Sequence, residues 1–429
     1  MGEWARDRAG KLPIMTLTSP AGGLLDQISV GLLTSSLPRE VIDEAIAQHG
    51  KQAKRSDGKL PPHVMVYFAM ALALFGEEDY EEVITRLAQP LARWGCWDWE
   101  APTTGGLTQA RQRLGWQVLE TIFTQVTAEP VADALTRGAW LGHLRTVSID
   151  GMVLDVPDSA ANAAEFGYGG GSATPSAFPQ VRVVTLNECG SHAPLAAAMG
   201  PGGGGKGTGE QSLARTLYHR LEPDMVLLAD RNFYSFTDFT QAADTGAQLL
   251  WRVKDTLELP VVQFLADGSY TSLVMAPKLS KKQRTHLLGA ARQGHDLEAD
   301  QARLVRVIEY EPPDRGQGEP EVICLITTLG DTRAMPAARL AQAYQQRWES
   351  EGANAELKTS LRGPGRVLRS HRPDMVRQEI YGYLLTYHAL CALICAAATE
   401  ADSDPDRIKF TRTVRLVRRR VVDPAAFSP

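Results

Sequence analysis

Apolar positions in the first third of the chain follow a helical period. From Leu24 to about Arg137 they recur at three- and four-residue spacing, which is typical of amphipathic helices. The run at 64–75 is almost entirely apolar and too short for a membrane span, so it predicts a buried helix. Further helices are predicted from Pro38, over 77–94 and over 107–126, the last after a break at Gly105-Gly106.

The pattern changes near Arg145, where short apolar runs begin to alternate with helical segments. The predicted strands are 147–149, 181–186, 194–198, 225–229 and 247–253, with helices at 211–220 and 236–243. The continuous run at 225–229 is typical of a strand buried on both faces. Alternating helices and strands of this kind predict an α/β domain.

The last part of the chain is predicted to hold four more strands, one long helix and one uncharged helix. The strands are 261–265, 270–274, 304–310 and 322–327, and the long helix runs from Pro336 to about Leu361. Residues 380–399 carry no charge over about the length of a membrane helix. Tyr381, Tyr383 and His388 lie among them, which favours a buried core helix over a membrane span.

Composition adds limits to this picture. The chain has 429 residues, enough for two or three domains, and a formal net charge of −5 from 45 Lys and Arg against 50 Asp and Glu. This balance excludes a uniformly basic coat for nucleic acid but leaves room for local basic surfaces. The five cysteines show no zinc-type spacing, and the first 17 residues hold no continuous hydrophobic signal core. We expect a protein in a reducing, cytoplasmic setting with no membrane contact.

The long helix carries the strongest chemical signal. Tyr344, Arg347, Glu351 and Lys358 fall at about 0°, 300°, 340° and 320° around an ideal helix, on one arc. A carboxylate can hold a divalent metal, while a phenol, a guanidinium and an amine can hold phosphate oxygens. Spacing alone leaves open a solvated face with ordinary ion pairs.

Two aspartates strengthen the signal. Asp150 ends the strand at 147–149 and Asp230 follows the run at 225–229. Sites in open α/β sheets form beyond the carboxyl ends of strands. Each aspartate alone could be a helix cap or a turn residue. Together with Glu351 they could hold two metal ions about 4 Å apart, the arrangement used for in-line phosphoryl transfer.

At this point the chain resembles a known family, the DDE transposases of bacterial insertion sequences of the insertion-element-four type. The family's Tyr, Arg, Glu, Lys signature is matched by Tyr344, Arg347, Glu351 and Lys358. Its first catalytic Asp precedes Gly and is matched by Asp150; its second is matched by Asp230. One departure is Asn232, where the family usually has Gly or Ala.

The resemblance implies an α/β fold: a ribonuclease-H-like catalytic domain with a β-rich insertion, preceded by an all-helical N-terminal domain that binds DNA. The boundaries implied are a tail at 1–21, the helical domain at 22–140, the catalytic domain at 141–253 and 333–400, the insertion at 254–332 and a basic C-terminal tail at 401–429.

The resemblance also implies an activity. Asp150, Asp230 and Glu351 would hold two Mg²⁺ ions, with Mn²⁺ able to substitute. The enzyme would bind double-stranded DNA at the element's terminal inverted repeats, act as a homodimer, and cleave and transfer strands into target DNA. Two alternatives stay open: an inactive DNA-binding descendant that acts as a repressor or inhibitor, and a metal-dependent nuclease that does not join strands.

Phosphate contacts are expected from the signature and from basic stretches. Tyr344, Arg347 and Lys358 are assigned to phosphates near the transposon end by the resemblance. Arg362, Arg366 and Arg369 follow the signature helix, and this position favours DNA contact. A second basic stretch, 407–420, holds seven cations and no acid; it could contact the DNA backbone or be a solvated tail.

Overall fold

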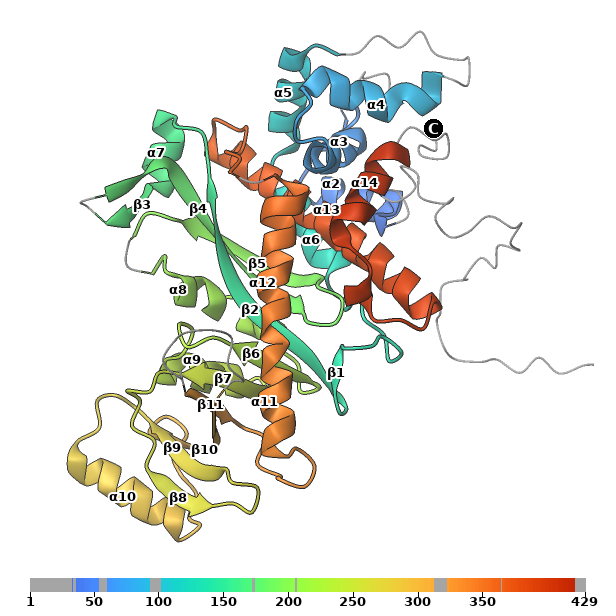
Figure 1. The fold of residues 1–429 in the computed structure, drawn as a ribbon. Helices are drawn as coiled ribbons and strands as arrows, with labels where there is room; N and C mark the ends of the chain where they lie inside the picture. The colour runs from blue at the N-terminus through green and yellow to red at the C-terminus, as the bar shows by residue number, and fades with distance from the viewer. Residues whose placement is uncertain are drawn as a thin grey trace, which may run out of the picture.

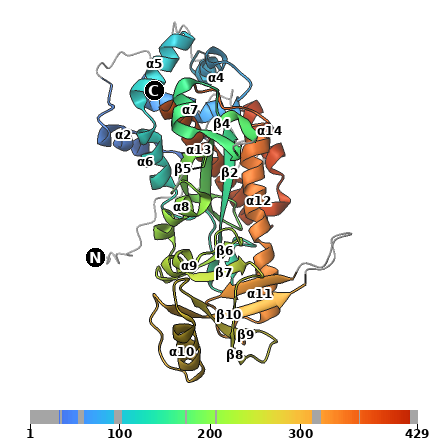
Figure 2. The same ribbon diagram turned by 90° about the vertical axis from the view of Figure 1, so that its left-hand side faces the viewer.

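The computed structural model describes residues 33, 36–53, 60–92, 102–171, 174–204, 207–311, 322–363 and 365–420. The predicted tail at 1–21 lies outside the described residues, as do 421–429. Figures 1 and 2 show an elongated molecule with the N-terminal helices at one end, a sheet in the middle and the predicted insertion at the other end.

The N-terminal part is helical, as predicted. Its helices are α2 (Arg39–Gln48), α3 (Pro62–Leu74), α4 (Tyr80–Ala92), α5 (Thr104–Leu114) and α6 (Gln117–Val126). From Met65 to Leu74 every residue of α3 is buried, which confirms the buried helix predicted there. Apolar side chains of α3, α5, α6 and the C-terminal helix α13 (Pro373–Glu400) share one core.

Two details of this domain were predicted wrongly. Gly105-Gly106 does not break the chain; both glycines lie in the first turn of α5, where the Thr103 side chain accepts a hydrogen bond from Gly106 N at 3.3 Å. The helix expected over 107–126 is instead two helices. Gly115, with a φ of 79°, ends α5 in a left-handed conformation that favours glycine.

The centre of the molecule is a mixed sheet. Its described strands are β1 (Trp140–Leu141), β2 (Leu144–Asp155), β3 (Tyr168–Gly171), β4 (Thr174–Glu188), β5 (Pro194–Pro201), β6 (Met225–Ala229), β7 (Gln248–Val253), β8 (Val261–Phe264), β9 (Tyr270–Met275), β10 (Ala302–Tyr310) and β11 (Ile323–Thr327). Strands β5, β4 and β2 are antiparallel neighbours, and β6 and β7 continue in parallel with β2. The order β5-β4-β2-β6-β7 is the one expected of a ribonuclease-H-like domain.

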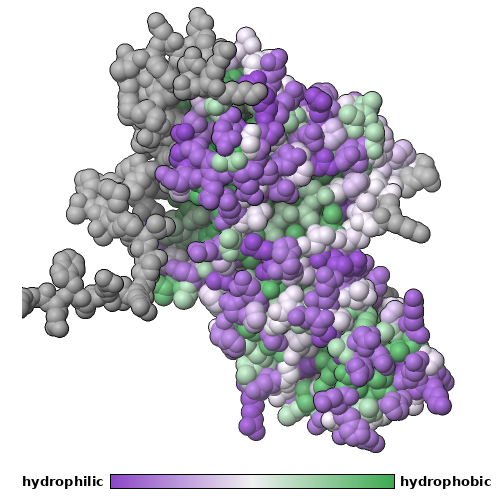
Figure 3. Space-filling view, turned by 180° about the vertical axis from the view of Figure 1, so that it is seen from behind, coloured by the Kyte–Doolittle hydropathy of each residue, from purple (hydrophilic) through white to green (hydrophobic). Residues whose placement is uncertain are grey.

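The predicted insertion extends the same sheet. Strand β11 pairs with β7 in antiparallel register, and β10, β9 and β8 follow outward. The sequence pattern missed one helix here, α10 (Lys281–Arg292), which packs Leu287 against Leu273 and Ala302. Its hydrophobic face is narrow, because only Leu287 is fully buried. Figure 3 shows apolar surface at this end of the molecule, where Phe264 and Leu304 are exposed.

Helices cover both faces of the central sheet. The helices that follow the N-terminal domain are α7 (Ala160–Phe166), α8 (Glu210–Arg215), α9 (Phe236–Ala243), α10, α11 (Ala337–Gln345), α12 (Arg347–Ala355), α13 and α14 (Phe410–Arg420). Side chains of α8 and α9 pack with Val147 and Ile149 on one face, whereas α11 packs with Leu228 on the other. Figure 2 shows the sheet between these two layers.

Helix α13 is long and apolar enough to cross a membrane, but 78% of its most apolar window is buried inside the protein. It packs against α3, and Gly382 approaches α3 so closely that a Cβ there would lie 2.6 Å from the Ala69 carbonyl oxygen. The apolar side chains of α13 therefore pack in the protein core, as predicted for 380–399.

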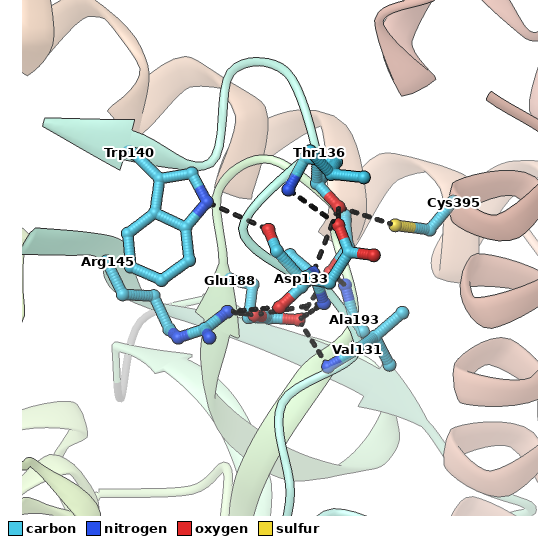
Figure 4. A network of polar contacts seen from close by, with 11 residues as sticks. Val131, Asp133, Thr136, Trp140, Arg145, Glu188, Ala193 and Cys395 are labelled. Atoms are coloured by element: carbon cyan, nitrogen blue, oxygen red, sulfur yellow. Dashed lines mark hydrogen bonds and ion pairs between the residues drawn. The ribbon is translucent and has the colours of Figure 1, made fainter. Parts of the chain in front are cut away.

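A buried polar network joins the segment after α6 to the sheet (Figure 4). The Glu188 carboxylate, 1% exposed, accepts hydrogen bonds from the backbone of Val131 and Ala132 at 2.9 and 3.0 Å. It also forms an ion pair with Arg145, whose guanidinium lies over the Trp140 ring. Because these charges are matched in a buried setting, the network fixes where β2 begins relative to the helical domain.

Candidate active site

The two predicted aspartates belong to neighbouring parallel strands. Asp230 directly follows β6 as predicted, but Asp150 does not end its strand, because β2 stays paired with β4 as far as Asp155. Ser148 of β2 pairs with Leu228 of β6, and two more residues along each strand place Asp150 beside Asp230. Leu228 packs on the α11 side of the sheet, so both aspartates belong to that face. Strand β6 ends at Ala229, which leaves β2 without this neighbour beyond Asp150. The candidate site therefore lies where β2 continues past the end of β6, a place that we call the notch.

The signature helix crosses this notch. The Tyr344 hydroxyl of α11 donates to the backbone oxygen of Ala229, next to Asp230, at 3.4 Å. One helix further on, Asn354 Nδ2 of α12 donates to Asp150 Oδ2 at 2.9 Å. The two contacts hold α11 against the end of β6 and α12 against the middle of β2 (Figure 1).

Position 351 lies on α12 between these two contact points, one turn before Asn354. On an ideal helix, positions three apart lie on the same face, so position 351 belongs to the face of α12 that also carries position 354. The side chain of Glu351 itself lies outside the described set. Its backbone position agrees with the prediction that it completes the site, and its role as a ligand stays a prediction.

The helix changes form immediately after this point. Residues Glu356–Leu361 make a π-helical turn, so the ideal 100° spacing used to place Lys358 does not hold there. Lys358 is exposed on this turn. Its position beyond the notch fits a contact with a bound phosphate. The helix face that Lys358 was predicted to share with Tyr344 does not continue through the π turn.

Tyr344 and Arg347 are buried at this interface, with 3% and 6% exposure. Burial raises the pKa of Tyr344 well above its ordinary value, so the phenol stays protonated and can donate to Ala229. The Arg347 guanidinium lies 5.8 Å from the centre of the Tyr344 ring. In this structure both residues position the helix, and phosphate contact by either stays a prediction.

Comparison with known proteins adds to this geometry. Residues 27–124 match the family described as Insertion element 4 transposase N-terminal, and residues 142–388 match the family described as Transposase DDE domain. The second match covers more than half of the chain. The chain belongs to the insertion element 4 family of DDE transposases.

Two curated relatives and one solved structure are similar. Transposase InsG for insertion sequence element IS4 of Escherichia coli (strain K12) is 26% identical over 396 residues, covering 92% of this chain and 83% of InsG. Putative transposase InsZ of the same organism is 26% identical over 215 residues, covering 49% of this chain and 67% of InsZ. The cryo-EM structure of the piggyBac transposase synaptic complex with hairpin DNA aligns with a TM-score of 0.48 and 9% identity, over 91% of this chain and 79% of that chain.

In this transposase, two of the three arginines after the signature helix, Arg366 and Arg369, contact the N-terminal domain. Arg369 donates to the backbone oxygens of Gly76 and Glu78 at 2.6 and 3.0 Å, and Arg366 pairs with Glu77 at 2.6 Å. Arg362 is 3% exposed, and burial lowers its pKa. These contacts join the two domains, while DNA binding by the same residues stays a prediction.

Sequence reasoning missed two residues of the site. Asn354, the partner of Asp150, lies three positions after Glu351 on the same helix, so the helical spacing could have shown it. Glu210, in the first turn of α8, gave no signal, because it follows a glycine-rich stretch with no recognisable pattern. Burial raises the pKa of Glu210, and the charges of Asp150 and Asp230 raise it further. Glu210 therefore lies within electrostatic reach of both aspartates.

Membership of the family implies use of a divalent metal, and the donors at the notch suit one. Carboxylate oxygens are the ligands preferred by Mg²⁺ and Mn²⁺. Over the described residues, no three His, Cys, Asp or Glu side chains converge as a metal site. Glu351, whose side chain lies outside that set, remains the predicted third ligand beside Asp150 and Asp230.

Proposed function

We propose that this transposase binds the terminal inverted repeats of its insertion sequence and catalyses metal-dependent strand cleavage and strand transfer. The proposal is supported by the parallel register of β2 and β6, in which Ser148 pairs with Leu228, two residues before each aspartate. It is also supported by the hydrogen bond to Asp150 from Asn354, on the helix that bears Glu351. We further propose that it acts as a homodimer on double-stranded DNA, in the cytoplasm on the nucleoid.

Each residue of the site has an assigned task. Asp150, Asp230 and Glu351 would hold two Mg²⁺ ions, which Mn²⁺ can replace. When bound, such ions activate the attacking oxygen and stabilise the leaving oxygen of an in-line phosphoryl transfer. Asn354 fixes the orientation of the Asp150 carboxylate through its 2.9 Å hydrogen bond. Lys358, exposed on the π turn, would bind a DNA phosphate beside the notch.

The test is cleavage of the encoding element's own terminal repeats with Mg²⁺ or with EDTA. Asp150→Ala, Asp230→Ala and Glu351→Ala should each abolish cleavage and leave binding to the ends nearly intact. Asp224→Asn is a matched control, because this exposed acid precedes the opposite end of β6. Normal cleavage by any of the three variants would remove that residue from the site.

Joining of a labelled end to a target plasmid then separates a transposase from a nuclease. We expect joined products that depend on the same three acids. Binding of the repeats without cleavage in Mg²⁺ or Mn²⁺ would instead indicate an inactive DNA-binding descendant.

A further inference from the structure

Glu210 lies against the glycine that follows the first catalytic aspartate. A Cβ built on Gly151 would lie 1.8 Å from Glu210 Oε1 and 2.8 Å from its Cδ, far inside contact distance. The backbone of Gly151 is not left-handed, so its conformation does not require glycine. The space above Gly151 is occupied by the Glu210 carboxylate, and only glycine leaves room for it.

The same turn of α8 holds the loop after the second aspartate. Gln211 Nε2 donates to the backbone oxygen of Asn232 at 2.6 Å, two residues beyond Asp230. A second contact from Gln211 reaches the backbone oxygen of Tyr234 at 3.4 Å. Two consecutive residues of α8 therefore touch the segments next to both aspartates.

Glu210 approaches from the face opposite the signature helix. Residues 147, 149 and 151 of β2 point toward α8 and α9, whereas Asp150 hydrogen-bonds to α12 on the other face. Because β6 ends at Ala229, no strand separates the two faces at this point on that side of β2. The charges of Asp150 and Asp230 act on the Glu210 carboxylate at this level of the sheet.

The charge of Glu210 is not matched by a bonded cation. Within the described parts of the chain, its carboxylate has no hydrogen bond or ion pair, although Arg182 is close enough to act on it electrostatically. A half-buried carboxylate beside two others is unfavourable unless a cation is present. By contrast, the buried Glu188 carboxylate near the other end of β2 is paired with the Arg145 guanidinium.

We propose that Glu210 is a fourth carboxylate of the active site, a positioning residue that strengthens binding of the divalent cations at Asp150 and Asp230. It acts through its negative charge and by accepting hydrogen bonds from water bound to a cation. This inference rests on the proposed function, because it assumes the metal site at the two aspartates. It also gives a physical reason for glycine at position 151.

The test measures Mn²⁺ binding to the full-length protein without DNA, by the loss of the free-ion electron paramagnetic resonance signal. We expect Glu210→Gln to weaken Mn²⁺ binding by about tenfold, the lower end of the effect of residues around metal ligands. Glu222→Gln, which neutralises an exposed acid near the start of β6, should leave binding unchanged. Asp150→Ala should remove binding.

A double-substitution cycle isolates the contact. Gly151→Ala forces the flexible Glu210 side chain away from its place, so it should also weaken Mn²⁺ binding. In the Glu210→Gln background the same change should have little further effect, because the charge is already absent. Gly151→Ala tests the proposal by itself should Glu210→Gln fail to fold.

The outcomes separate the two claims. Wild-type affinity in Glu210→Gln, or fully additive effects of the two substitutions, would overturn the role of Glu210 while leaving the proposed function in place. Wild-type Mn²⁺ binding by Asp150→Ala would overturn the metal site itself, and with it both proposals.

Discussion

Two basic segments flank the core helix α13, and they differ in what their guanidinium groups contact. Before α13, Arg366 and Arg369 bond to the loop between α3 and α4, and Arg362 is buried. After α13, residues 407–420 include α14, whose Arg412, Arg415 and Arg419 are exposed. The first segment joins two domains, and the second presents its charge to solvent.

Helix α14 divides its residues sharply between two faces. Phe410, Val414 and Val417 are buried in the core. Arg418 donates to the backbone oxygen of Leu361 at 3.2 Å, which fixes α14 beside the π turn that carries Lys358. The segment predicted as a basic tail thus contains a docked helix, and its exposed arginines lie on one face at three- and four-residue spacing. The comparison shows that arginines of two basic stretches can differ in use, since those of the first bond to the protein and those on the outer face of α14 are exposed.

The largest effect is expected for Arg369, whose guanidinium makes two hydrogen bonds to backbone oxygens of the N-terminal domain. Arg369→Ala removes two hydrogen bonds to backbone oxygens at the domain junction and the packing of the guanidinium on the Tyr80 ring. The free energy of unfolding should fall by about 2–3 kcal/mol, because the backbone oxygens in the junction are then left without donors. Urea denaturation measures this. An unchanged midpoint would show that the junction does not depend on Arg369.

The next effect is expected at α14. Substitution of Arg412, Arg415 and Arg419 together by Gln should lower affinity for repeat DNA about ten- to a hundredfold at moderate salt. The slope of log affinity against log salt should fall by about two to three, roughly 0.9 for each phosphate that the protein no longer neutralises. Gel shifts in EDTA measure both without cleavage. An unchanged slope would show that α14 does not contact DNA, and replacement by Lys should keep the slope.

The sequence predicted the architecture in detail but only part of the site. Helical and strand periodicity placed β6, β7 and α9 nearly to the residue, because each is a simple apolar pattern between clear turn signals. Two features depended on local backbone chemistry that periodicity does not carry. Because the Thr103 side chain caps α5, this helix begins before Gly105-Gly106. The π turn changes the angle between successive residues of the signature helix, so residues beyond it do not lie on the predicted face.

The site was predictable where chemistry follows a strand end or a helix face. Asp230 follows the end of β6 as predicted, whereas Asp150 lies inside β2, which continues to Asp155 because its pairing with β4 extends beyond the short apolar run. Glu210 could not be found this way, because it reaches the notch from a short helix that is distant in sequence and its only signature is the glycine opposite it. Likewise, no pattern indicated that Arg369 would bond to Gly76, since such a contact depends on how two domains dock.

A smaller effect is expected for Lys358, an exposed cation on the π turn that follows α12. Lys358→Ala should weaken binding of the transposon end, most strongly at low salt, and reduce the salt slope by about one. Stability should not change, because the side chain is exposed and forms no ion pair within the described residues. Titration of end DNA at several salt concentrations tests it, with Lys358→Arg as the variant that keeps the charge.

The smallest effect is expected for Arg366, which belongs to the first segment but forms a mostly exposed ion pair. Glu77, its partner, is 85% exposed on its side chain, so solvent screens the pair. Arg366→Ala should therefore lower the free energy of unfolding by less than about 1 kcal/mol and leave the salt slope of DNA binding unchanged. Urea denaturation beside Arg369→Ala, with gel shifts in EDTA, measures both. A fall in DNA affinity with a reduced salt slope would instead show that Arg366 contacts a DNA phosphate. The two basic segments would then not differ in the way described.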